Sequence, residues 1–248
     1  MGRVKIIENI LFLSEITDYN LEDINISKMI FHKLHEIENY SLDQLAENLN
    51  ISNYTLKKYI QNFGYHTYSE FKEDILYEIN FSSFRLKKII SEENEEKLLE
   101  NLDSLHIDMS DIENICHDLY NSQNIYILGS PYLLCLSIKF SLNMKLMKKT
   151  VLNNSSKKVF SNKITSQDMA IILSPFGVEF YGTDGGIKEI MLNKHIKKWI
   201  LSNSKPFETE HYISVDSKTT TFSIDTLIVN FFNLLSIKYY KMYGKESL

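Results

Sequence analysis

Apolar residues recur every three or four positions through the first third of the chain, which is the period of an amphipathic helix. Ser41 and Ser52 stand where a helix N-cap is expected, and Gly64 stands where a helix commonly ends. The pattern predicts helices over 26–37, 41–49, 52–63 and 69–84, followed by a charged helical stretch to residue 105. The N-terminal part of the chain is therefore expected to be all-α.

The pattern changes at Ile125, where a short and continuously apolar run ends in Gly129. Three similar runs and a long closing helix follow, over 169–174, 199–202, 212–215 and 223–243. Helical segments separate the first runs, and strands that are apolar on both faces and alternate with helices are typical of a parallel sheet between helical layers. The predicted fold class is an all-α helix-turn-helix domain followed by an α/β domain whose parallel sheet is flanked by helices.

The helices over 41–49 and 52–63 are joined by a tight turn, as in a helix-turn-helix, whose second helix enters the major groove of DNA. At 100° per residue, Leu56, Tyr59 and Ile60 share one inward face with Phe63. The candidate DNA-contacting residues begin and line the outer side of the second helix: Ser52, Asn53, Tyr54, Thr55, Lys57, Lys58 and Gln61.

Net charge changes along the chain. The whole chain carries −5, but residues 1–85 carry −5, residues 86–124 carry −7 and residues 125–248 carry +7. Residues 51–69 contain two lysines and His66 and no acidic side chain. A locally cationic helix on an acidic domain suits insertion between two phosphate strands, so overall acidity does not exclude binding to double-stranded DNA.

Other classes of function find little support. Cys116 and Cys135 cannot form a disulfide framework, so we expect a reducing cytoplasm and interpret both as small buried hydrophobes. No apolar stretch is long enough to cross a membrane. His32 and His35 lack metal-site spacing, and no nucleotide-binding or nucleophile motif occurs. We therefore expect no metal, no cofactor and no enzymatic activity.

The N-terminal motifs resemble the DNA-binding domain of the RpiR family of bacterial transcriptional regulators. The resemblance covers roughly residues 20–80 and rests on Ser41–Glu47, Ile51–Tyr59, Asn62–Tyr65 and Tyr68–Lys72. The pair Gly64-Tyr65 and the later Phe71-Lys72 are not part of a generic helix-turn-helix. Lys58 stands where the family usually has arginine, which keeps the charge but loses a bidentate donor for guanine.

The second half resembles the SIS (sugar isomerase) domain that usually follows in that family. The resemblance implies a phosphosugar site after the first two strands, held by hydroxyls and backbone amides. Here those loops read Gly129-Ser130-Pro131-Tyr132-Leu133 and Ser174-Pro175-Phe176-Gly177-Val178-Glu179. The candidate ligand-binding residues are the retained or substitute positions Gly129, Ser130, Ser174 and Gly177.

The same loops depart from the family pattern. Pro131 replaces a glycine, Pro175 removes a backbone donor, and Leu133 and Phe176 replace hydroxyl positions. Glu179 would bring a negative charge near a phosphate. We therefore interpret the fold as retained and the usual phosphosugar site as degenerate. A capping turn over 183–186 is expected before the next helix.

Two surface features bear on partners. The apolar stripe of the closing helix is wider than one sheet face needs and predicts an isologous interface; it comprises Leu227, Ile228, Phe231, Phe232, Leu235 and Tyr239. A lysine cluster is either a solvated surface or a surface for an anion or partner, such as the acidic 92–103 segment of a neighbouring subunit; it comprises Lys145, Lys148, Lys149, Lys157, Lys158 and Lys163.

Taken together, these features predict a helical DNA-binding domain over 1–84, a helical linker over 85–111 and a SIS-like effector and dimerisation domain over 112–248. The predicted function is a cytoplasmic transcription regulator of the RpiR type that binds a double-stranded DNA operator as a homodimer or tetramer. Three alternatives stay open: a phosphosugar-binding regulator with a non-standard site, a regulator whose second domain only dimerises, and a phosphosugar isomerase. The isomerase is disfavoured because no catalytic base is identifiable.

Overall fold

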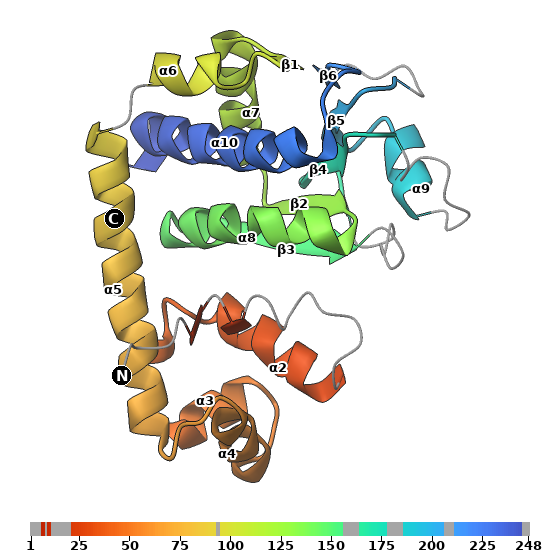
Figure 1. Cartoon of the computed structure of the whole chain (residues 1–248). Helices are drawn as coiled ribbons and strands as arrows, with labels where there is room; N and C mark the ends of the chain where they lie inside the picture. Colours follow the sequence, from red (N-terminus) through yellow and green to blue (C-terminus); the bar gives the residue numbers. More distant parts are fainter. Residues whose placement is uncertain are drawn as a thin grey trace. The chain divides into compact units, whose positions relative to one another are not determined.

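A computed structural model of the chain describes residues 6–7, 9–10, 21–92, 95–155, 164–177, 186–205 and 211–244. The chain divides into two compact units, Met1–Arg85 and Leu86–Leu248, and each is described by itself (Figure 1). The described part contains no helix long and apolar enough to cross a membrane.

The first unit is helical, with α2 (Leu21–His32), a short 3-10 turn (Ile37–Asn39), α3 (Leu42–Asn48), α4 (Asn53–Asn62) and the start of α5 (Tyr68–Glu92). Ser41 and Gln44 form a capping box at α3, and the Ser52 hydroxyl accepts from the backbone N–H of Thr55 at α4. The first predicted helix, over 26–37, was placed five residues too late, because α2 begins at Leu21 and ends at His32 in a turn. Leu34 and Ile37 are nevertheless buried, so their apolar spacing reflects the core rather than a continuing helix.

Helix α5 also differs from the prediction. It runs without a break through residue 84, where we expected one helix to give way to a linker. Its start is capped because Thr67 accepts from the backbone N–H of Glu70 while the Glu70 carboxylate accepts from that of Thr67. No glycine or proline occurs between residues 68 and 92, so nothing in the sequence ends the helix earlier.

The second unit is an α/β domain, as predicted. Its helices are α6 (Glu95–Glu100), α7 (Met109–Asn121), α8 (Pro131–Leu146), α9 (Gly186–Leu192) and α10 (Thr221–Tyr239), which continues into a π turn (Tyr240–Gly244). Its strands are β1 (Leu105–His106), β2 (Asn124–Gly129), β3 (Thr150–Ser155), β4 (Met169–Ser174), β5 (Lys197–Ser202) and β6 (Tyr212–Val215). They form one sheet in the order β1-β6-β5-β4-β2-β3.

All the described strand pairs are parallel except β1 with β6. Two strands were missed by the sequence analysis, and both are at an edge of the sheet. β1 has two residues and lies inside the stretch that we expected to be linker, and β3 carries the polar run Asn153-Asn154-Ser155. Neither has the apolar run that marks a strand covered on both faces.

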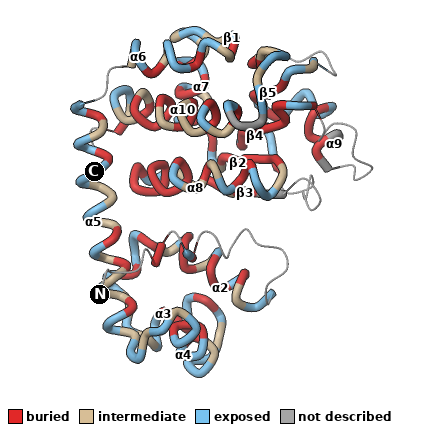
Figure 2. Tube along the Cα trace, viewed as in Figure 1, coloured by how far each residue is buried: buried red, intermediate tan, exposed pale blue. Residues whose placement is uncertain are grey.

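Alternate residues of each central strand face different helical layers. One face packs on α9 through a cluster that includes Leu128, Ile172 and Ile190. The other face packs on α8, which contacts β2 and β3; α8 packs in turn on α10, and α10 on α7. Figure 2 shows that α8 and α10 both contain many buried residues. The stripe on α10 that we expected to form an isologous interface is covered within the chain: all six of its residues are buried, and Phe232 stacks on Phe140 of α8. That argument for a dimer was wrong.

The sheet order places the two loops of the expected ligand site at a topological switch point. From β2 the chain proceeds through α8 to β3 on one side, whereas β4, β5 and β6 follow on the other side. The connection that leaves β2 and the connection that leaves β4 therefore run to opposite sides of the sheet, starting from the neighbouring carboxyl ends of these two strands. In open α/β sheets, ligands bind at such positions.

Candidate functional site

Helices α3 and α4 form the helix-turn-helix. The chain turns over residues 49–52, where Asn50 has a φ of 53°, and the backbone N–H of Ile51 donates to the carbonyl of Ala46. Asparagine tolerates this left-handed conformation better than most residues. Ser52 has an extended backbone and is the N-cap residue of α4. Only residues 49–52 therefore separate the two helices.

The inner face of α4 is firmly anchored. Leu56, Tyr59 and Ile60 are buried, as the spacing predicts. The Tyr59 hydroxyl lies 2.8 Å from the Ser27 hydroxyl of α2, and burial raises the pKa of Tyr59. The ring of Phe63 packs edge-on against Tyr59 and also contacts Phe71 of α5. These contacts fix which face of α4 is presented outward.

The outer face of α4 separates the seven candidate residues into two groups. Tyr54 is 77% exposed, and Lys57, Lys58 and Gln61 are also exposed. The others hold local structure: the Ser52 and Thr55 hydroxyls are 2.9 Å apart in the cap, and the Asn53 amide donates to the Asp43 carboxylate of α3. Tyr54, Lys57, Lys58 and Gln61 are thus the side chains best placed to reach a partner.

Charges of both signs lie around α4, but they occupy different places. The helix itself carries no carboxylate, while Asp43 of α3 and Asp23 of α2 stand beside its two ends. Each of these carboxylates accepts from an asparagine of α4, Asn53 or Asn62. The lysines at 57 and 58 therefore supply the only formal charge on the exposed side of α4.

At the carboxyl ends of the adjacent strands β2 and β4, the structure places Gly129 and Ser174 as the last strand residues and Ser130 and Gly177 in the segments that follow. Gly129 ends β2, and a Cβ there would lie 3.1 Å from the carbonyl oxygen of Leu173 on β4. Ser130 is the N-cap residue of α8, but its hydroxyl makes no capping hydrogen bond. Ser174 is fully buried at the end of β4. Close strand packing is thus one reason for a glycine at 129.

Gly177 packs against a loop that the sequence analysis did not single out. Its φ is 72°, and a Cβ there would lie 2.3 Å from the Ser204 hydroxyl oxygen. The backbone N–H of Asn203 donates to the carbonyl of Pro175, which joins the loops after β4 and β5. The Ser204 hydroxyl is buried without a hydrogen-bond partner among the described residues. Only strand order could have identified Ser204, because β5 neighbours β4.

The departures from the family pattern are structural as well as chemical. Leu133 is buried in α8, Pro131 occupies the first helical position, and Phe176 is exposed. The Tyr132 hydroxyl donates to the Asp225 carboxylate of α10, which ties the starts of the two helices together. Glu179 and residues 183–185 of the expected capping turn lie outside the described residues.

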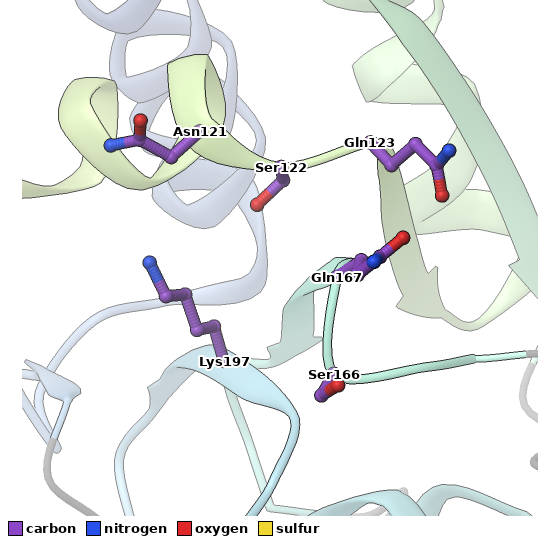
Figure 3. A pocket seen from close by; sticks show the side chains of 6 residues that line it. All are labelled: Asn121, Ser122, Gln123, Ser166, Gln167 and Lys197. Atoms are coloured by element: carbon purple, nitrogen blue, oxygen red, sulfur yellow. The ribbon is translucent and has the colours of Figure 1, made fainter.

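An open polar hollow of about 480 Å³ lies at the other edge of the sheet, near the amino ends of β2, β4 and β5 (Figure 3). It is lined by Asn121, Ser122, Gln123, Ser166, Gln167 and Lys197. Lys197 is 3.0 Å from the Asp118 carboxylate, so its charge is already paired. None of the four candidate ligand residues lines this hollow.

The expected lysine cluster is not a common cationic surface among the described residues. Lys145 is buried, and Lys149 donates to the backbone carbonyls of Tyr120 and Ser122, where burial lowers its pKa. Lys148 is exposed, and Lys157, Lys158 and Lys163 lie outside the described residues. Cys116 is buried as expected, but Cys135 is exposed on α8, which corrects that prediction.

No protein-family model matches the sequence, and no curated protein matches it. Among solved structures, the Vibrio vulnificus NanR protein complexed with ManNAc-6P is similar at 14% identity and a TM-score of 0.49, over 96% of this chain and 95% of that chain. The sugar isomerase domain of an RpiR transcription factor from Sphaerobacter thermophilus is similar at 10% identity and a TM-score of 0.48, over 66% and 93%.

The C-terminal domain of glucosamine-fructose-6-phosphate aminotransferase from Francisella tularensis is similar at 12% identity and a TM-score of 0.47, over 82% of this chain and 55% of that chain. Identities and TM-scores of this size do not assign a family. The functional assignment therefore depends on the residues and geometry of this chain.

Proposed function

We propose that the chain is a cytoplasmic transcription regulator of the RpiR type, rather than an enzyme, which binds a double-stranded DNA operator through α4. One observation carries the proposal. Helix α4 is anchored by buried residues on one side, while its other side exposes Tyr54, Lys57, Lys58 and Gln61 and no carboxylate. A rigid helix with exposed cationic and amide side chains is what entry into the major groove requires.

The exposed side chains would make different kinds of contact with DNA. Lysines contribute mainly by neutralising phosphates and so set affinity without reading sequence. The Gln61 amide can donate and accept, which suits the edge of adenine, and the Tyr54 ring offers an apolar surface near the helix start. The Ser52–Thr55 cap and the Asn53–Asp43 contact would keep that helix start in place.

The two units would have separate tasks. We assign DNA binding to residues 1–84, connection to residues 85–111, and assembly and effector response to the SIS-like residues 112–248. An active regulator of this kind is expected to be at least a homodimer, because two recognition helices must meet two half-sites. An effector, where one exists, would shift the equilibrium between two spacings of those helices.

We further propose that the usual phosphosugar site is degenerate. Ser174 is fully buried, Leu133 is buried in α8, and Gly177 is packed against Ser204, so few hydroxyls remain at the edge to replace the hydration of a phosphate. Ser130 is the candidate with the most accessible hydroxyl, because it is partly exposed and makes no capping hydrogen bond.

The test of DNA binding uses an operator selected from random duplexes. Tyr54→Ala combined with Lys58→Ala removes one candidate base contact and one phosphate contact, and should weaken binding by at least about 1–3 kcal/mol, the usual cost of losing one base contact. Lys28→Ala, which removes an exposed lysine of α2, is the matched control and should leave affinity nearly unchanged. Equal affinities for the double variant and the control would show that α4 does not read the DNA.

The ligand site is tested separately by thermal unfolding in millimolar hexose phosphates and amino-sugar phosphates. A ligand present at about 100 times its dissociation constant would stabilise the fold by roughly 2.7 kcal/mol. We expect no shift of the midpoint. An upward shift that disappears in Ser130→Ala would contradict the degenerate site and favour a phosphosugar-binding regulator with a non-standard site.

A further inference from the structure

Helix α5 exposes an aromatic stripe, defined here as Tyr77, Phe81 and Phe84. Their side chains are 48%, 47% and 65% exposed, and spacings of four and three residues place them on one face of the helix. The rings of Tyr77 and Phe81 are stacked with centroids 6.1 Å apart. Figure 2 shows exposed turns along this helix. Three neighbouring aromatic rings in water mark an interaction surface rather than scattered surface residues.

The stripe is distinct from the face that α5 uses to hold the first unit. Phe71 and Ile75 are fully buried, and Tyr65 packs edge-on against Phe71. Glu78 is buried on that side, where its carboxylate accepts from the backbone N–H of Ile7. Among the described residues, the core of the first unit therefore packs against the other face of α5.

Charges of opposite sign lie at the two ends of the stripe. At 100° per residue, Glu73 precedes the stripe on the same face, and Lys88 follows it. Both side chains are exposed. Glu73 accepts from the Ser69 hydroxyl, and Lys88 is 3.7 Å from Glu92 in an exposed pair within the helix. Such exposed pairs are weak, so both charges remain available for a partner.

We propose that this face binds the same face of a second copy of the chain, with the two α5 helices antiparallel. The midpoint between Tyr77 and Phe84 along the helix is also the midpoint between Glu73 and Lys88. A two-fold axis at that point therefore places Tyr77 of each copy opposite Phe84 of the other copy. It also places Glu73 of each copy opposite Lys88 of the other copy, so each contact occurs twice. A parallel pair in the same register would instead oppose like charges, which is unfavourable.

The proposed interface goes beyond DNA recognition and does not depend on it. Helix α4 and the start of α5 belong to the same unit, and only residues 63–67 separate the end of α4 from α5. Pairing of two α5 helices would therefore hold two copies of α4 at a defined separation. A chain that pairs in this way without binding DNA would leave the interface proposal intact and contradict only the proposed function.

The first test is sedimentation equilibrium of the full chain without DNA. Replacing the stripe by Tyr77→Ser, Phe81→Ser and Phe84→Ser should weaken self-association at least tenfold, while Tyr54→Ser, which removes an exposed ring of α4, should have no effect. Far-ultraviolet circular dichroism checks that helix content is preserved. An unchanged association constant in the stripe variant, or a monomeric parent chain at tens of micromolar, would overturn the proposal.

A charge exchange tests the antiparallel arrangement. Glu73→Lys alone and Lys88→Glu alone should each weaken self-association, because each places like charges together twice. The double variant should recover it. Mixing the two single variants should also restore dimers, since both contacts are then complementary in the mixed pair. Single variants that associate as well as the parent chain, or a mixture that gains no dimer, would exclude this register.

Discussion

Gly64 and Gly177 both have positive φ values, 84° and 72°, but the space around them differs. No atom lies within 4 Å of a Cβ placed on Gly64, whereas one placed on Gly177 would lie 2.3 Å from the Ser204 hydroxyl oxygen. Gly64 is therefore required by conformation alone, at the end of α4. Gly177 is required by conformation and by its packing against the loop after β5.

This difference predicts the cost of adding a methyl group. Gly64→Ala should lower the free energy of unfolding by about 1–2 kcal/mol, the usual cost of a left-handed residue with a Cβ. Gly177→Ala should cost about 1 kcal/mol more, because the Ser204 side chain must move. Urea unfolding followed by circular dichroism measures both. In Gly177→Ala with Ser204→Ala, the extra cost should vanish; its persistence would argue against the contact.

At the scale of elements, Asp168 joins the starts of β2 and β4. Its buried carboxylate accepts from the backbone N–H and side-chain amide of Asn124, and from the backbone N–H and hydroxyl of Thr165. Burial opposes ionisation, but these donors outweigh it and lower the pKa of Asp168. The ionised form is therefore the one that stabilises the fold.

The lowered pKa fixes the sign of the pH dependence. The contribution of Asp168 to the free energy of unfolding should be complete above the pKa of an unfolded aspartate. It should be lost as the pH falls through the lower pKa of Asp168 in the folded state. Asp168→Asn should cost about 1–3 kcal/mol at neutral pH and make unfolding less sensitive to acid. Urea unfolding at pH 7 and at successively lower pH values tests this. Parallel curves for the two proteins would contradict it.

At the scale of the whole molecule, the uneven charge decides how DNA can be approached. Residues 1–85 are acidic overall with a net charge of −5, so attraction to phosphate must come from the local lysines of α4. Affinity should fall steeply with salt, because each neutralised phosphate releases a counterion. An acidic chain with a small cationic surface is thus expected to bind DNA in one orientation only.

Salt titration separates the roles of two exposed residues of α4. Lys57→Ala should weaken binding and reduce the slope of log K against log salt by about 1 per bound chain. Gln61→Ala should weaken binding to the selected operator without changing that slope, since an amide releases no counterion. Equal slopes for Lys57→Ala and the parent chain would show that Lys57 does not contact phosphate.

The sequence by itself determined the features that depend on nearby residues. The caps at Ser41 and Ser52, the buried side of α4 and the four central strands follow from hydrogen bonds and apolar periods that span only a few positions. The same local reasoning predicted which α4 side chains are exposed.

Tertiary structure decided everything that needs a partner far along the chain. β1 is a strand only because β6 pairs with it, and the polar β3 is a strand because β2 lies beside it. In the sequence, α10 and α5 both show apolar residues at helical spacing. In the structure, the apolar face of α10 is covered by α8 and α7, whereas the aromatic face of α5 is exposed. Ser204 reaches Gly177 because β5 neighbours β4. Periodicity records that a face is apolar, but burial depends on which element folds against it, and that contact is made across long separations in sequence.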